Sequence, residues 1–321
     1  MRLIASAALF AALTAAAGAA FAQAFPTRPV TLMVPFAPGG GSDTVARIIQ
    51  PKLSERLGQP VLVENRPGAS GAIATNAVAK ATPDGHTLFL SWDTHAINAA
   101  VVKDLPYDTF KDFVPVTLLA RLPLVMGVWA GLPANSVAEF IALAKREPGK
   151  LNYASVGSGS SNRLYSEYMH SLAGINVAHI PYKGGGPSIQ AMLTGEVAYS
   201  ILSFASMKGH LQAGKLKAFA VTGSKRMPDL PNVPTMIESG FPGFEVYGWI
   251  GIFAPAGTPE AVIARLNRDF IAAVQDPEVG RKFAAAGVEG IGSTPAELDR
   301  WVRAEVDKWT KFVRTSNLKF E

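Results

Sequence analysis

The sequence predicts an α/β protein with a mostly parallel sheet, and three observations lead to that class. Short apolar runs alternate with stretches whose apolar residues recur at helical spacing, which is typical of successive β–α units. Several of the runs pass through a glycine-rich turn directly into a helix. Hydrophobic residues make up 48% of the 321-residue chain and charged residues 17%, which indicates an ordered globular protein with a sizeable core.

The first β–α unit is the clearest part of this pattern. Residues 30–34 predict a buried strand, which Pro35 and Pro38 end because proline cannot donate a hydrogen bond to a sheet. Three glycines follow, and Ser42 or Asp43 is expected to cap the next helix. Unpaired N–H groups and the helix dipole make such a helix start a site for anions. The turn is therefore either an anion site or a glycine-rich connection that binds nothing.

The rest of the chain continues the alternation. Further strands are predicted at residues 61–63, 87–90, 114–119, 124–129, 151–155, 197–202, 216–221 and 244–253. Helices are predicted at residues 72–80, 136–147, around 164–172, from Pro187, and at 260–274, 277–286 and 295–313. Residues 91–95 are expected to form a polar loop, and residues 121–123 a crossing between domains. The aromatic residues of 241–253 are interpreted as core and hinge packing.

Residues 1–22 have the pattern of a secretory signal peptide. Arg2 precedes an apolar stretch, and Ala20-Phe21-Ala22 provides a cleavage site with small residues on both sides. The alternative is a membrane anchor, for which this Ala-rich run is short. No later stretch approaches ~18 uncharged apolar residues, so we expect a soluble, exported, periplasmic protein.

The lack of cysteine and the distribution of charge exclude several functions. Without cysteine the chain has no lipoprotein anchor, disulfide, thiolate metal site or cysteine nucleophile. The net charge of +5 is scattered, and no run of five basic residues occurs. This pattern argues against nucleic acid and against a basic membrane-binding patch, while allowing mild attraction of anionic ligands.

Sequence motifs of common enzymes are missing or incomplete. Residues 209–216 imitate a phosphate-binding loop, but Leu216 stands where a serine or threonine must hold magnesium. Gly157 and Gly159 begin like a dinucleotide fingerprint, yet Asn162 replaces its third glycine. No Gly-x-Ser-x-Gly elbow occurs, and the five histidines lack metal-binding spacing. The sequence therefore predicts no catalytic residue, no metal and no cofactor.

Three glycine-rich turns between a strand and a helix remain as the candidate site. They are residues 36–43, 157–163 and 182–187, called here the first, second and third turn. Backbone amides and serine hydroxyls suit a carboxylate, because each of its oxygens accepts several hydrogen bonds without a buried counter-charge. If the turns are divided between two domains, they face each other across a cleft.

Seven segments, spread in order over the mature chain, resemble one family. They are residues 26–30, 34–43, 64–69, 105–108, 181–187, 231–235 and 254–259, including Val34-Pro35-Phe36-Ala37-Pro38-Gly39-Gly40-Gly41-Ser42-Asp43 and Glu64-Asn65-Arg66-Pro67-Gly68-Ala69. These segments resemble the Bug-type substrate-binding proteins of tripartite tricarboxylate transporters.

The resemblance implies a two-lobed periplasmic binding protein of type II, a Venus flytrap in which each lobe is a Rossmann-like α/β sheet. Lobe 1 would comprise residues 23–120 and 242–321, and lobe 2 residues 121–241. A monomer would capture a di- or tricarboxylate, an aromatic acid or an acidic amino acid in the cleft. It would deliver this ligand to membrane permease subunits without chemical change.

The candidate ligand-binding residues come from the three turns and from the end of the strand at residues 87–90. They are Phe36, Ala37, Pro38, Gly39, Gly40, Gly41, Ser42 and Asp43; Asp93, Thr94, His95 and Ala96; Ser158, Gly159, Ser160, Ser161 and Arg163; and Tyr182, Lys183, Gly184 and Gly185.

Two of these residues, Arg163 and Asp93, point to different kinds of ligand. Arg163 stands where many relatives carry a histidine; pointing inward it would pair with a second carboxylate, and pointing outward it is a solvated helix residue. Asp93 either holds a ligand amine or caps the next helix. Two other functions are also open, a ligand-sensing partner of a membrane receptor and a periplasmic hydrolase on the same lobes.

Overall fold

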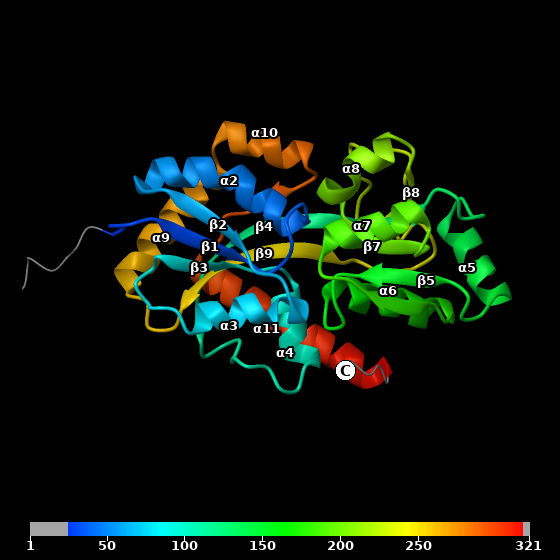
Figure 1. Cartoon of the computed structure of the whole chain (residues 1–321), viewed down its shortest axis with the longest axis horizontal. Helices are drawn as coiled ribbons and strands as arrows, with labels where there is room; N and C mark the ends of the chain where they lie inside the picture. Colours follow the sequence, from blue (N-terminus) through cyan, green and yellow to red (C-terminus); the bar gives the residue numbers. More distant parts are fainter. Residues whose placement is uncertain (1–24, 317–321) are drawn as a thin grey trace, which may run out of the picture.

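The computed structural model describes residues 25–316, and the predicted signal peptide lies outside that range. Helices and strands alternate as the sequence predicts (Figure 1). The strands are β1 (Val30–Val34), β2 (Val61–Asn65), β3 (Thr87–Leu90), β4 (Phe113–Trp129), β5 (Asn152–Ser155), β6 (Ala178–Pro181), β7 (Tyr199–Ser203), β8 (Leu216–Val221), β9 (Tyr247–Pro255) and β10 (Glu289–Gly290). The helices are α2 (Gly41–Leu57), the 3₁₀ helix η1 (Ala69–Gly71), α3 (Ala72–Ala79), α4 (Thr94–Val101), α5 (Val137–Arg146), α6 (Ser161–Ala173), α7 (Gly185–Thr194), α8 (Phe204–Gln212), α9 (Glu260–Val274), α10 (Pro277–Ala285) and α11 (Pro295–Ser316).

The strands form one continuous path in the order β2-β1-β3-β9-β4-β7-β5-β6, with β8 and β10 paired to β4. Both ends of the path are parallel, and β3, β9, β4 and β7 pair antiparallel in the middle. Figure 1 shows β1–β3 with α2, α3 and α9 on one side, and β5 and β7 with α5–α8 on the other. We call these sides lobe 1 and lobe 2. The α/β class is confirmed, with an antiparallel centre that the alternation alone did not reveal.

The long strand β4 joins the two lobes. It pairs with β9 as far as Pro123 and with β7 from Leu124 onward. The sequence predicts two strands here, separated at residues 121–123, and this is wrong because the chain remains extended through Pro123. Since the proline lies where the pairing partner changes, its missing N–H interrupts no long ladder. The residue limits of the lobes stay a prediction, although β4 changes partner close to one of them.

Three predicted helix starts need correction. Helix α2 begins at Gly41 with Gly40 as N-cap, so Ser42 and Asp43 lie inside its first turn. Helix α7 begins at Gly185, two residues before Pro187. Helix α4 begins at Thr94 within the expected polar loop, and Asp93 makes no capping bond because its backbone is already helical. In α2 and α7 the chain enters the helix earlier than its most obvious start signal, and α4 forms a helix where a loop is expected.

The core includes most of the aromatic cluster at residues 241–253. Phe241, Phe244, Trp249 and Phe253 are each at most 5% exposed. Tyr247 is half-buried beneath the Arg121 guanidinium, at 5.4 Å. Within residues 25–316, none of the helices has the length and apolar character needed to cross a membrane.

Candidate functional site

The three turns meet where the lobes face each other. The first turn follows β1 in lobe 1, and the second and third turns follow β5 and β6 in lobe 2. Parallel pairing of β1 with β3 and of β5 with β6 brings the carboxyl ends of these strands together. The turns are therefore divided between the lobes, as a cleft requires.

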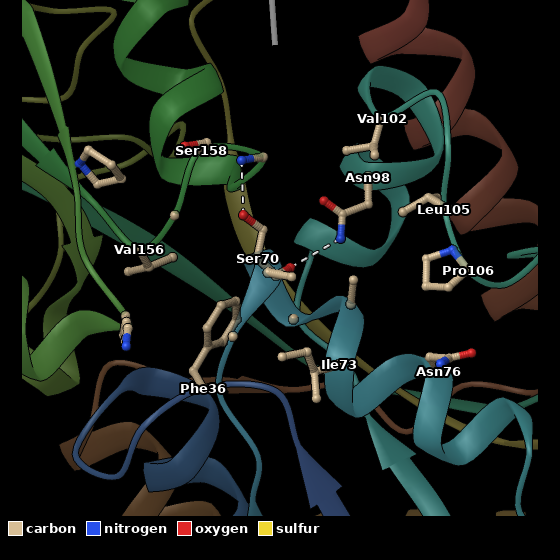
Figure 2. Close-up of a pocket in the computed structure, with 18 of the residues that line it drawn as sticks. Phe36, Ser70, Ile73, Asn76, Asn98, Val102, Leu105, Pro106, Val156 and Ser158 are labelled. Carbon is tan, nitrogen blue, oxygen red and sulfur yellow. Dashed lines mark hydrogen bonds between the residues drawn. The ribbon is translucent and has the colours of Figure 1, made fainter. Parts of the chain in front are cut away.

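A large cavity of about 610 Å³ opens between the lobes (Figure 2). Lobe 1 contributes Phe36, residues 68–73, α4 and the chain after it, while lobe 2 contributes residues 156–159 and 181–183. Its size falls in the usual range of small-molecule sites. Ser158, Gly159, Tyr182 and Lys183, all predicted from the sequence, line this cavity.

A second cavity of about 30 Å³ lies deeper, between the first turn and lobe 2. Gly40, Gly41 and Ser42 face Gly185 and Ser203 across it. Phe36 and Val156 line both cavities, so the two spaces adjoin. The smaller space is about the volume of one water molecule. The site thus has a roomy part and an inner part with serine hydroxyls on both sides.

Close approach of the lobes explains two of the glycines. A Cβ placed on Gly41 would lie 2.6 Å from Ser203 Oγ, and one on Gly184 would lie 3.3 Å from the Ala37 nitrogen. Gly184 also has a φ of +136°, which side chains rarely allow. Pro38 and Gly39 are exposed and line neither cavity. Because Gly41 and Gly184 have no side chain, the first turn can pack directly on lobe 2.

Polar contacts also cross between the lobes. The Gly159 N–H donates to Ser70 Oγ at 2.9 Å, and the Ser161 N–H donates to Thr94 Oγ1 at 3.3 Å. Ser70 and its neighbour Ala69 have φ values of 51° and 45°, the positive-φ residues other than glycine in the described chain. Such a conformation is strained and is found most often at functional sites.

Asp93 joins the lobes behind the cavities. Its side chain is fully buried, and Tyr165 Oη of α6 donates to Asp93 Oδ2 at 2.9 Å. Burial raises the pKa of Asp93 to about 8, and the charge of Glu305 on α11 adds to this effect, while hydrogen bonds from Ser161 and Tyr165 oppose it. Asp93 lines neither cavity, so a contact between this carboxyl group and a ligand amine does not fit this geometry.

His95 and Ala96, both expected in the cleft, lie instead in the core of lobe 1. His95 is 2% exposed among the rings of Phe89, Tyr107, Phe113 and Phe253. Burial lowers the pKa of His95 to about 3, so the imidazole is neutral. Because α4 begins at Thr94, each following residue turns by about 100° away from the cleft. Of residues 93–96, Asp93 and Thr94 contact lobe 2, whereas His95 and Ala96 do not.

Asp43 and Arg163 stabilise the first and second turns by hydrogen bonds to their backbones. Asp43 Oδ2 accepts the Gly39 N–H at 3.0 Å, and both of its oxygens accept Arg47 Nε. Despite the opposing effect of burial, these bonds lower the pKa of Asp43. Arg163 Nη1 donates to the Ser158 carbonyl at 2.9 Å, and Arg163 lines neither cavity. Asp43 also lines neither, so in this structure both side chains hold a turn in shape, and their contact with a ligand stays a prediction.

Two further predicted residues, Ser160 and Tyr182, form hydrogen bonds within lobe 2. Ser160 caps α6, accepting the Arg163 N–H and donating to the Gly157 carbonyl. The Tyr182 hydroxyl donates to Glu196 Oε1 at 2.7 Å. Sequence reasoning missed Ser70, Ile73 and Asn98, which line the large cavity, and Ser203, which lines the small one. Their one detectable signal was the position of Ser70 in a glycine-rich loop after a strand.

Comparison with known proteins finds a family that matches most of this chain. Residues 45–318 match the family described as "Tripartite tricarboxylate transporter family receptor". Protein BugT of Bordetella pertussis is 36% identical over 322 residues, covering 100% of this chain and 99% of that protein.

Solved structures agree with this match. The periplasmic binding protein BugD is similar with a TM-score of 0.88 and 33% identity, covering 92% of this chain and 99% of that chain. Rpa4515 of R. palustris with adipate has a TM-score of 0.89 and 37% identity, covering 92% and 99%. MatC from Rhodopseudomonas palustris with bound malate has a TM-score of 0.86 and 36% identity, covering 90% and 100%. The chain therefore belongs to the tripartite tricarboxylate transporter receptor family, together with the periplasmic Bug binding proteins.

Proposed function

We propose that this protein captures a small carboxylate between its lobes and delivers it to the membrane subunits of a tripartite tricarboxylate-type transporter. One observation carries the proposal: glycine-rich turns from both lobes close around two adjoining cavities lined by glycines and serines, whose amides and hydroxyls are neutral donors. Neutral donors of this kind suit a carboxylate without a buried counter-charge. Related structures contain adipate and malate, which supports an acid as the ligand.

Binding rather than catalysis fits the positions of Asp93 and His95. Asp93 holds the lobes together through Tyr165, and His95 is neutral inside the core of lobe 1. Neither lines a cavity, so neither can exchange a proton with a ligand held there. We therefore propose that the ligand leaves chemically unchanged.

A thermal-shift panel tests carboxylate binding. Ligand-stripped mature protein is heated with mono- and dicarboxylates, aromatic acids and acidic amino acids. A ligand that binds only the folded state raises Tm by mass action, and 100 times its Kd corresponds to about 2.7 kcal/mol. A panel that leaves Tm unmoved throughout would contradict the proposal.

Gly40→Asp tests whether the first turn is the site. Gly40 has a φ of −83°, and a Cβ there would meet only the Ala37 carbonyl at 3.7 Å, so the backbone and the Cβ of an aspartate fit. Its negative charge would repel a carboxylate, and we expect the thermal shift to disappear. Gly280→Asp on α10, where a Cβ meets nothing within 4 Å, is the matched control. Retained binding in Gly40→Asp would exclude this turn.

Export and delivery need separate tests. We expect N-terminal sequencing of periplasmic protein to start at Gln23, after removal of the signal peptide. A deletion strain is expected to lose uptake of the ligand that the panel identifies. Loss of gene induction with normal uptake would instead support a receptor partner.

A further inference from the structure

Exposed apolar side chains gather on one wall of the large cavity. Ile73 on α3 is 49% exposed, and Val102 directly after α4 is 36% exposed. Leu105 is half-buried and Phe36 is 6% exposed where they extend this wall, and Val156, 7% exposed, faces them from lobe 2 (Figure 2). Exposed apolar side chains beside a hollow are typical of a surface that a partner covers. An apolar ligand body would remove Ile73 and Val102 from water.

Charge is sparse on the same walls. Among the described residues that line the cavity, Lys183 and Asp104 are the ones with charged side chains, and both are exposed. Lys183 is thus the one cation among these lining residues, and a compact di- or tricarboxylate bound here would bury any further carboxylate without a partner cation, which is unfavourable. The walls therefore favour a ligand with one buried acid group.

Asn98 offers an acceptor that nothing in the described structure satisfies. Its Nδ2 donates to the Ser70 carbonyl at 3.1 Å, which fixes the orientation of the amide. Its Oδ1 is buried without a hydrogen-bond partner, in a residue that is 2% exposed and lines the cavity. In Figure 2 this oxygen points toward the loop of Ser158. A Cβ on Gly159 would lie 3.0 Å from this oxygen, so the second turn covers it in this structure. A buried acceptor without a donor is costly, and a ligand O–H or N–H that enters between Asn98 and the second turn before the lobes close would satisfy it.

We propose that the ligand is an acid with an apolar body, aromatic or branched aliphatic, that carries a hydroxyl or N–H donor for the Asn98 oxygen. This inference rests on the proposed function, because it assumes that the crevice binds a carboxylate. The acid group meets the neutral donors of the turns, and the body covers Ile73 and Val102. The structure thereby selects among the acids that the family resemblance left open.

Calorimetric titration of the ligand-stripped mature protein compares matched probes. They are 3- and 4-hydroxybenzoate against benzoate, 2-hydroxy-4-methylpentanoate against 4-methylpentanoate, and malate and citrate as compact polar acids. We expect at least one apolar hydroxy acid to bind tenfold or more tightly than malate and citrate. We also expect it to bind fivefold or more tightly than its analogue without the hydroxyl.

Two variants connect these preferences to residues. Ile73→Ser should weaken the best apolar hydroxy acid about fivefold, whereas Leu62→Ser, also at a side chain 49% exposed but outside the cavity, should not. Asn98→Ala should abolish the advantage of the hydroxyl group. If Asn98→Ala does not fold, the paired acids on the unchanged protein still measure that advantage.

The outcomes separate this inference from the proposed function. Malate or citrate binding as tightly as every apolar acid, or an unaltered affinity in Ile73→Ser, overturns the apolar body and leaves carboxylate capture intact. Equal binding of the paired acids with and without the hydroxyl overturns the role of Asn98. If no acid binds, the proposed function fails, and this inference fails with it.

Discussion

The contact between the lobes has two parts of different chemistry. Beside the large cavity it consists of neutral groups, with the Gly159 N–H donating to Ser70 Oγ and apolar side chains exposed nearby. Behind the cavities it contains a fully buried carboxyl, Asp93, bonded to Tyr165. The difference indicates that the contact that holds the lobes together and the contacts that would select a ligand lie in separate regions. We propose that the front recognises a ligand mainly through neutral groups, whereas the back contains a carboxyl whose pKa burial raises.

The largest expected effect concerns the back of the contact, in the variant Asp93→Asn. In the folded protein burial raises the pKa of Asp93 to about 8, against an ordinary value of 3.8. The protonated form is therefore favoured by folding. This contribution is complete below pH ~4 and is lost as the pH rises to ~8, by roughly 6 kcal/mol at most. Asparagine resembles the protonated acid and should retain its stability across that range.

Urea unfolding at pH 4 and pH 8 measures this difference. We expect the two proteins to be similar at pH 4 and Asp93→Asn to be the more stable at pH 8. Subtracting the variant from the unchanged protein cancels the titration of all other groups. Asp104→Asn, an exposed carboxyl beside the large cavity, is the control and should leave the profile unchanged. Parallel pH profiles for Asp93→Asn and the original protein would show that the back of the contact does not titrate.

Gly41→Val tests whether ligand binding requires the first turn to pack against lobe 2. A Cβ at this position would lie 2.6 Å from Ser203 Oγ and 3.0 Å from Trp92, so valine should hold the lobes apart. We expect a loss of ligand affinity of about 100-fold, or ~2.7 kcal/mol. Small-angle scattering should show no compaction when ligand is added. Gly280→Val, in open space on α10, should behave normally. Full affinity in Gly41→Val would mean that the first turn need not meet lobe 2.

The same comparison separates what the sequence could predict from what it could not. The first turn was predictable because strand, glycines and helix follow one another within 14 residues, 30–43. The Ser70 contacts were not, because its partners Asn98 and Gly159 lie 28 and 89 residues away. His95 failed for a local reason, since the start of α4 one residue earlier turns its ring into the core. Patterns along the chain locate the turns, and only the packed lobes decide which side chains face the cavity.

Ser70→Gly is the smallest and most discriminating change, because stability and binding should move in opposite directions. Glycine adopts the φ of 51° without strain, so the free energy of unfolding should rise by up to about 1 kcal/mol. The Gly159 N–H would lose its acceptor, and ligand affinity should fall about fivefold, a net hydrogen bond being worth ~1 kcal/mol. Ala69→Gly relieves a similar φ of 45° but keeps the Ser70 hydroxyl, so it should stabilise the protein without weakening binding. If both variants bind equally well, the Ser70 hydroxyl contributes nothing to closure, and the front of the contact rests on apolar packing alone.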